Sequence, residues 1–293
     1  MSAFITQVVD GVGVGSVYSL LAMAIVLIFR ATRIVNVAQG EFAVLSTFIA
    51  WQFLEWGINL YLAVGLTILI SFLIGVTVYR TVVRYTEDRD HLVTIVVTIG
   101  MLLVIHQLGG WLWGVDVRSF PSVFGDGTTV IGGISFSHHT LATVAVLIVT
   151  AALFQLFVTK TRLGLAMRAA AESDEWSRLA GVPASRMFAV GWGISLGVGA
   201  VAGVLAAPTF FLDPNMLLGA TLYAFAAAAI GGFDSVAGAA IGGVIVGVTE
   251  NLAGAYIDFI GSDLKITIPL LLMFAVLTIR PNGLFGTREV SRV

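Results

Sequence analysis

The chain has 293 residues, of which 58% are hydrophobic and 11% are charged, and its mean hydropathy is +1.00. Soluble domains carry roughly 25% charged residues, so this composition excludes a soluble globular domain and predicts one integral membrane domain over residues 1–293. The net charge of −2 favours no class of partner, and no nucleic acid is expected. The lack of cysteine excludes disulfides and thiolate metal sites.

The first hydrophobic segment runs from Gly11 to Phe29 and ends at Arg30. Its length is close to the ~20 residues that a helix needs to cross a bilayer core. The residues before Arg30 include Asp10 and no basic residue, so they lack the positively charged start of a cleaved signal peptide. We expect a spanning helix whose N-terminus lies outside the cell.

The second segment, Asn36–Trp56, is irregular because it begins with polar residues and has Gly40 near its start. A broken backbone is tolerated at membrane depth where protein or water satisfies its polar groups, and such breaks point to the pathways of transporters. We therefore place Asn36, Gln39 and Glu41 in a path for a solute.

Two acidic residues beside hydrocarbon, Glu41 and Glu250, also admit a structural interpretation. An acid in such a place is a functional candidate by default. In that interpretation Glu41 is a helix-start acid at the interface that is free to pair with Arg33, and Glu250 ends an apolar run where it can cap or pair. Both interpretations stay open for each residue.

Three further apolar segments, Trp56–Tyr79, Leu92–Val115 and Gly127–Thr159, contain no acid or base. Each is long enough to span the membrane. Thr94 and Thr98 lie in the second of these segments, and we add them to the candidate path.

A polar element, residues 160–186, then carries five of the fifteen basic residues. Its first part favours helix by composition, and Gly181 followed by Pro183 is a stop signal. Trp176 and Leu179 share one helical face that would be exposed on a free loop, which indicates a groove on a partner. The alternative is a surface helix that folds back on its own bundle.

The next apolar segment, Met187–Leu212, contains a G-x-S-x-G pattern centred on Ser195. The pattern lies inside an apolar helix and not on the strand-to-helix turn of a hydrolase, so we interpret it as helix packing. Small residues four apart recur, which predicts close helix contacts at Gly11/Gly15, Gly193/Gly197, Gly199/Gly203, Gly238/Gly242 and Gly243/Gly247.

The segment Gly219–Glu250 is rich in alanine and glycine, and a second break interrupts it at residues 231–235. Since broken helices mark transport paths, the candidate path also includes Gly231, Gly232, Asp234 and Ser235. A last apolar segment, Ile266–Ile279, follows.

The positions of the basic residues predict the topology. Thirteen of the fifteen fall at alternate ends of the segments, and only Arg118 and Lys265 fall at the opposite ends. The positive-inside rule places the thirteen in the cytoplasm. The sequence therefore predicts an all-α polytopic transmembrane bundle of about nine hydrophobic segments, some of them short or broken, with the N-terminus outside and the C-terminus inside.

Sequence patterns for catalysis, metal binding and nucleotide binding do not fit this chain. The four histidines have no ligand spacing, so no catalytic residue and no metal site is predicted. The two lysines, Lys160 and Lys265, do not follow glycine, so the chain has no P-loop. If ATP drives transport, another polypeptide must hydrolyse it.

Five motifs, in order and at matching intervals, resemble those of the permease subunits of branched-chain amino-acid ABC importers, a family that also includes urea and short-amide importers. The motifs are Gly15–Leu20 with Ile34–Phe42, Thr98–Gly100, Arg162–Val182, Ala229–Ala239 and Thr278–Gly286. The chain departs from the family pattern at Gln39, where His is common, and at Asp234, where Gly is common.

The resemblance implies a multi-pass importer subunit in the bacterial cytoplasmic membrane. This chain would pair with a second, homologous permease within the lipid, two cytoplasmic ATPase subunits would bind its inner face, and an extracytoplasmic binding protein would deliver the solute. ATP and Mg²⁺ would be held by the ATPase subunits, and this chain would need no cofactor. The solute would be a branched-chain or other small amino acid, or a related small polar or amphipathic compound. The ATPase contacts would come from a coupling helix at about 160–186, at Arg168, Glu172, Asp174, Trp176, Arg178, Leu179 and Gly181.

Two alternatives to an ATP-driven permease remain. Glu41, Glu250 and the broken segments also suit an ion- or proton-coupled secondary transporter, which would take up solute without an ATPase. An intramembrane hydrolase that uses Ser195 is the third hypothesis, and Ser195→Ala would inactivate it.

Overall fold

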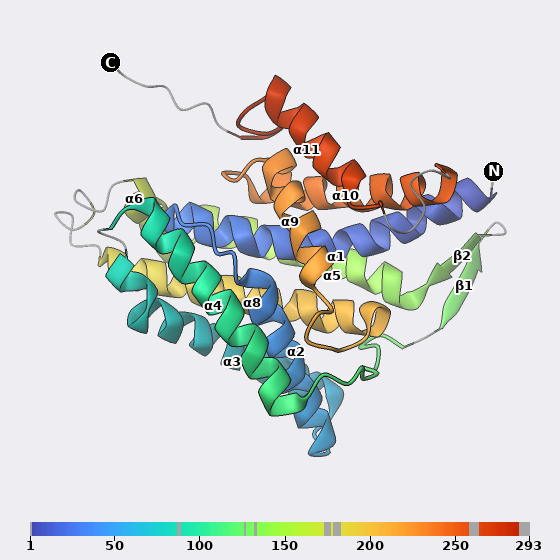
Figure 1. Ribbon diagram of the computed structural model, residues 1–293, viewed down its shortest axis with the longest axis horizontal. Helices are drawn as coiled ribbons and strands as arrows, with labels where there is room; N and C mark the ends of the chain where they lie inside the picture. The colour runs from blue at the N-terminus through green and yellow to red at the C-terminus, as the bar shows by residue number, and fades with distance from the viewer. Residues whose placement is uncertain are drawn as a thin grey trace.

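The computed structural model describes residues 2–86, 89–125, 127–131, 134–172, 177, 183–257 and 264–286. Figure 1 shows an almost entirely helical bundle with one small hairpin at the end where the N-terminus lies. Its elements are α1 (Ser2–Thr32), α2 (Gln39–Glu55), α3 (Leu60–Thr81), the 3₁₀ helix η1 (Val83–Thr86), α4 (His91–Trp113), β1 (Thr128–Ile131), β2 (Ile134–Ser137), α5 (His138–Lys160), α6 (Arg162–Glu172), α8 (Ala184–Phe210), α9 (Leu218–Gly231), α10 (Val236–Tyr256) and α11 (Thr267–Ile279).

Six of the described helices are long and apolar enough to cross a membrane, namely α1, α3, α4, α5, α8 and α10. The remaining hydrophobic helices are shorter, with 17 residues in α2, 14 in α9 and 13 in α11. A 14-residue helix is about 21 Å long, less than the ~30 Å hydrocarbon core. The polytopic helical bundle predicted from composition is therefore confirmed, whereas the count of about nine hydrophobic segments stays a prediction.

Helix α1 lies at the centre of the bundle and packs against α10, α8 and α9. The α1–α10 contact depends on glycine. A Cβ on Gly15 would lie 2.8 Å from the carbonyl oxygen of Gly243, and one on Gly11 would lie 2.7 Å from Cα of Val248. Gly247 meets the backbone of Gly15 in the same way. The spacing of small residues thus predicted this packing correctly.

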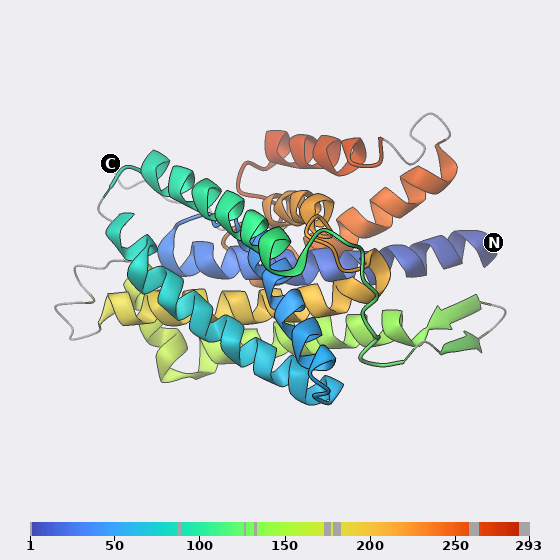
Figure 2. The same ribbon diagram turned by 60° about the horizontal axis from the view of Figure 1, so that its bottom comes forward.

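The chain turns back into the bundle after α1. Arg33 adopts a left-handed backbone conformation (φ 57°), and the following residues have no regular structure until α2 begins at Gln39. Gln39 lies beside Ser195, whose hydroxyl donates to the carbonyl of Ala24 at 2.6 Å. Ala24 precedes the end of α1 by eight residues, or about 12 Å of helix. Helix α2 therefore starts deep within the protein and runs obliquely to α1 (Figure 2).

The predicted span Gly127–Thr159 is wrong in its first third. Thr128–Ile131 and Ile134–Ser137 form the antiparallel pair β1–β2, with Thr128 paired to Ser137, and only His138–Lys160 is helical. The β-branched residues Thr128, Thr129 and Val130 favour strand over helix, which hydropathy alone does not detect.

The second predicted break is confirmed between α9 and α10. Gly232 has a φ of 99°, and the Ser235 hydroxyl accepts a 2.9 Å hydrogen bond from the Gly238 N–H to cap α10. The C-terminal segment packs on the break, because the Leu284 N–H donates to the Ile230 carbonyl at 2.8 Å and the Phe285 N–H to the Gly231 carbonyl at 3.1 Å. The end of α9 is thus satisfied by protein and not by solvent.

Candidate functional site

A buried polar cluster joins α1, α2 and α8. The Asn36 side-chain amide donates to Gln39 Oε1 at 3.1 Å, and the Ser195 hydroxyl lies 3.2 Å from the same oxygen. Asn36, Gln39 and Ser195 are all fully buried. The structure therefore brings together two of the three path residues predicted at the start of α2, and it adds Ser195 to them.

Glycines on α8 make room for this cluster. A Cβ on Gly199 would lie 2.5 Å from Gln39 Nε2, and one on Gly203 would overlap Thr47 on α2. The Gly199/Gly203 pair predicted as a packing surface thus packs against the polar start of α2. This contact is what allows a helix to begin inside the bundle.

Glu41, the third predicted path residue of α2, faces a different partner. Its Oε2 lies 3.1 Å from Nδ1 of His106 on α4, and the two side chains are 7% and 27% exposed. Pairing of Glu41 with Arg33, which the sequence left open, is wrong. The correct partner is 65 positions away, and no local pattern points to it.

Arg33 instead fastens the end of α1 to the break between α9 and α10. Its guanidinium donates to the Asp234 carboxylate at 2.8 Å and lies 5.6 Å from the ring centre of Phe29. The Phe29 and Phe233 rings are 5.2 Å apart. Asp234 is therefore an ion-pair partner at this turn, and Gly231, Gly232 and Ser235 shape the turn around it.

Thr94 and Thr98 lie away from the polar cluster. The Thr94 hydroxyl donates to the carbonyl of Thr86 in η1 at 3.3 Å. The Thr98 hydroxyl donates to the carbonyl of Ile95 at 2.9 Å. Both side chains are buried, but their hydrogen bonds stay within α4 and η1. No described contact joins them to Asn36 or Gln39.

The first part of the polar element 160–186 forms α6, which packs on α5, α8 and the end of α1. Met167 and Ala170 are buried in a small apolar cluster with Ala31 of α1. Leu165 on the opposite face is 60% exposed, and Arg168 is exposed at the side of the helix, where it borders a small hollow with Ala31 of α1. Glu172 ends this helix, and the remaining predicted contact residues lie outside the described residues: Asp174, Trp176, Arg178, Leu179 and Gly181.

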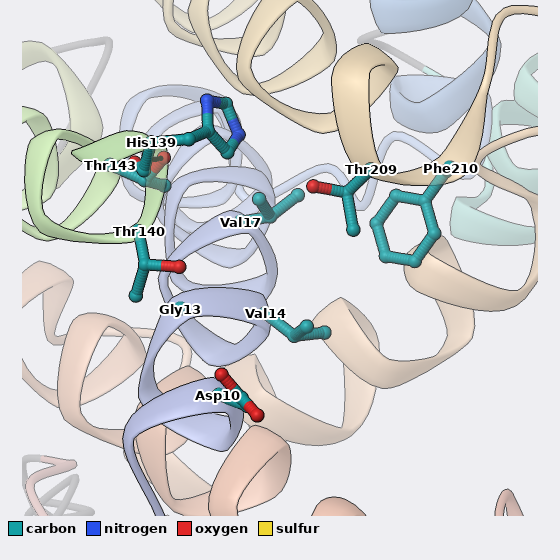
Figure 3. Close-up of a pocket in the computed structure, with 9 residues that line it drawn as sticks. All are labelled: Asp10, Gly13, Val14, Val17, His139, Thr140, Thr143, Thr209 and Phe210. Carbon is teal, nitrogen blue, oxygen red and sulfur yellow. Dashed lines mark hydrogen bonds between the residues drawn. The ribbon is translucent and has the colours of Figure 1, made fainter. Parts of the chain in front are cut away.

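A cavity of about 190 Å³ lies between α1, α5 and α8, at the end of the bundle that holds the N-terminus (Figures 1 and 3). Its lining combines one carboxylate, hydroxyls and apolar side chains: Asp10, Gly13, Val14, Val17, His139, Thr140, Thr143, Thr209 and Phe210. No local sequence pattern points to this site, because the residues that form it lie up to 200 positions apart along the chain.

Comparison with known proteins places the chain in a family. Residues 7–277 match the family described as "Branched-chain amino acid transport system / permease component". The chain belongs to this permease family. The resemblance inferred from the five motifs is therefore confirmed.

Individual relatives of this permease match along nearly their whole length. The "High-affinity branched-chain amino acid transport system permease protein LivH" of Escherichia coli K12 is 29% identical over 99% of this chain and 98% of its own. The corresponding protein of Salmonella typhimurium gives the same values. BraD of Pseudomonas aeruginosa is 26% identical over 99% of this chain and 98% of its own length. Among solved structures, "PsaBC from Streptococcus pneumoniae in complex with Fab" covers 94% of this chain and 91% of its own, with 12% identity and a TM-score of 0.49.

The geometry of this permease gives no support to the hydrolase hypothesis. The Ser195 hydroxyl is fully buried and donates to a backbone carbonyl of α1, so it bridges two helices. Within the described ranges, no group of three or more His, Cys, Asp or Glu side chains could hold a metal ion. The relatives are transport permeases and not enzymes.

Proposed function

We propose that this chain is the permease subunit of an ATP-driven importer for branched-chain or other small amino acids, or for related small polar or amphipathic solutes. The observation that carries this proposal is the family match over residues 7–277, together with full-length relatives whose names describe branched-chain amino-acid permeases. The six long apolar helices suit a multi-pass membrane protein. This subunit forms the solute path and does not itself catalyse a reaction.

The importer has further subunits. A second, homologous permease pairs with this chain, two cytoplasmic ATPase subunits bind ATP and Mg²⁺, and an extracytoplasmic binding protein delivers the solute. The absence of a P-loop lysine in the sequence supports a separate ATPase. The location is the bacterial cytoplasmic membrane, with the N-terminus outside, the C-terminus inside and about nine hydrophobic segments counted with the short helices.

Helix α6 and the residues that follow it, up to about 186, form the contact with the ATPase. One face of α6 packs on α1 and α8 through Met167 and Ala170. A displacement of α6 would therefore be transmitted to the bundle. Leu165 on the other face and Arg168 at the side of the helix are both exposed and lie one turn apart, which suits a partner groove. A coupling element must contact the motor differently in the two states of the transporter, or it transmits nothing.

The solute path lies along the start of α2. Asn36, Gln39 and Glu41 place amide and carboxylate groups inside the bundle at a helix that begins part-way through it. Polar groups at such a depth are costly unless they serve a path or a packing role. The break between α9 and α10 borders the same end of α1 through the Arg33–Asp234 ion pair.

Two acidic substitutions on the exposed side chains of α6 test the ATPase contact. In the reconstituted importer, Arg168→Glu and Leu165→Asp should each lower solute-stimulated ATP hydrolysis about tenfold, since loss of about 1.4 kcal/mol of coupling corresponds to that factor. Both side chains are exposed, so the fold should not change. Arg84→Glu, at an exposed position of η1, is the matched control and should leave coupling intact. Unchanged coupling in both α6 variants would refute this contact.

A further inference from the structure

The cavity between α1, α5 and α8 presents hydrogen-bonding groups that the protein itself does not use. Asp10 lies at its edge and is exposed, and it has no hydrogen-bond or ion-pair partner among the described residues. Figure 3 shows the hydroxyls of Thr140 and Thr209 pointing into the cavity from opposite walls. Neither hydroxyl has a partner in the part of the chain that the structure describes.

Other polar groups that line the cavity already form hydrogen bonds within the protein, and these bonds hold its wall in place. His139 Nε2 lies 3.0 Å from the Leu205 carbonyl oxygen, which can only accept, so Nε2 donates there. Its Nδ1 lies 3.1 Å from the Ser122 hydroxyl. The Thr143 hydroxyl donates to the carbonyl of His139 at 2.8 Å. The imidazole is thus held in place and fixes α5 to α8.

The α8 wall of the cavity is also the irregular end of that helix. Pro208 lies inside α8 and has no N–H for the helical ladder, and Phe211 ends the helix with a φ of 61°. Thr209 and Phe210, between these two residues, face the cavity. The lining is therefore built from a helix end that is already distorted, as is common at binding sites.

The remaining lining gives the cavity a second, apolar character. Figure 3 shows Val14 and Val17 projecting from α1 and Phe210 from the end of α8, and all three line the cavity. No lysine or arginine lines the cavity within the described residues. A carboxylate and two hydroxyls beside an apolar surface suit a molecule with a primary ammonium group and a small apolar side chain, because the ammonium offers three donors and the apolar part is removed from water.

From these contacts we infer that the cavity is a loading site, in which the ammonium group of the solute is bound by Asp10 and the hydroxyls of Thr140 and Thr209, and its side chain by Val14, Val17 and Phe210. The inference rests on the proposed importer function, and it narrows the solute class to compounds with a free primary amine. In the proposed orientation the cavity lies at the outer end of the permease, opposite α6, where solute arrives from the binding protein.

The absence of native cysteine allows a direct test of occupancy. In the assembled importer, in membranes without phosphatidylethanolamine, Val14→Cys places one thiol on the cavity wall. The neutral reagent methyl methanethiosulfonate should modify this thiol, and L-leucine should slow the modification. Leucinol, which keeps the amine, should also protect, whereas 4-methylpentanoate, which lacks it, should not.

Removal of the carboxylate tests the ammonium contact. Asp10→Asn in the Val14→Cys background should raise the L-leucine concentration for half-protection about tenfold, as expected for loss of a charge-assisted hydrogen bond. Asp116→Asn, at an exposed acid that does not line the cavity, should leave that concentration unchanged.

Four results would overturn the inference: protection by 4-methylpentanoate as strong as by L-leucine, no protection by L-leucine, a Val14→Cys thiol that the reagent cannot reach, or protection that requires added phosphatidylethanolamine. The last result would assign the site to a lipid amine. ATP-dependent uptake, measured on the importer with native Val14 in the same membranes, separates the two proposals. Uptake without protection contradicts only the loading site, and protection without ATP-dependent uptake contradicts the importer function.

Discussion

Glu41 is the carboxylate of the candidate path that lies deepest in the protein. It is 6% exposed as a whole residue and faces only one charged or titratable partner among the described contacts, His106. A buried carboxylate in a membrane protein is a candidate for binding the solute or for positioning a residue that binds it. The structure holds it on a helix that begins inside the bundle, next to Gln39 and Asn36.

We predict that Glu41→Gln lowers solute uptake by the reconstituted importer about tenfold, since an amide keeps the size of the side chain but loses a charge-assisted hydrogen bond of about 1.5 kcal/mol. Assembly with the partner subunits, followed by size-exclusion chromatography, should not change. Glu55→Gln, at the other end of α2, is the control. Uptake at the wild-type level would remove Glu41 from the path.

Single residues differ in how far the sequence could predict them. Asn36, Gln39 and Glu41 were found because each is polar in an apolar context, a signal that needs no tertiary information. Their partners, Ser195 and His106, are 156 and 65 positions away, so only the fold reveals them. Asp10 was visible in the sequence, but its role depends on a cavity shared with α5 and α8.

At the scale of elements, glycine contacts set the distance between α1 and α10. Gly15→Ala would place a Cβ 2.8 Å from the Gly243 carbonyl oxygen. Overpacking of this kind costs about 1–3 kcal/mol, so we predict a lower midpoint of thermal unfolding in detergent. Gly65→Ala on α3 is the matched control, because no described atom beyond the local backbone of α3 would lie within 4 Å of its Cβ.

The expected effect of the control has the opposite sign. Alanine is favoured over glycine inside a helix by about 1 kcal/mol, so Gly65→Ala should leave the midpoint unchanged or raise it. Equal destabilisation by the two substitutions would show that the α1–α10 contact is not held as closely as the structure describes.

The ion pair between Arg33 and Asp234 joins two elements, the end of α1 and the turn after α9. Both side chains are partly exposed, at 48% and 28%, so we predict a coupling energy of at most about 1 kcal/mol in a double-mutant cycle of unfolding. Arg33→Asp combined with Asp234→Arg should recover most of the stability that either single reversal loses. Strictly additive losses would show that the two side chains do not interact.

The elements were predictable where hydropathy and small-residue spacing decide them. The long helices, the break between α9 and α10 and the glycine contacts follow from such patterns. The hairpin β1–β2 could not be predicted in this way, because its residues are uncharged like those of a span and are distinguished by their β-propensity. The depth at which α2 begins depends on the hydrogen bonds of Gln39 and Ser195, which no local pattern contains.

At the scale of the whole molecule, the two proposed contact regions lie at opposite ends of the bundle. The cavity is at the end of α1 where the chain begins, and α6 packs where α1 ends (Figure 1). Central α1 touches both, since Val14 lines the cavity and Ala31 packs with Met167. A displacement of α6 by an ATPase would therefore act on the same helix that borders the solute cavity.

The proposed importer depends on an external motor, and uptake by reconstituted vesicles tests that dependence most directly. Vesicles that contain this chain with its partner permease, ATPase subunits and binding protein should accumulate L-leucine only when ATP is supplied on the ATPase side. Vesicles that contain this chain alone should show no uptake, even under an imposed proton or sodium gradient. Gradient-driven accumulation by the chain alone would contradict the account and favour a secondary transporter.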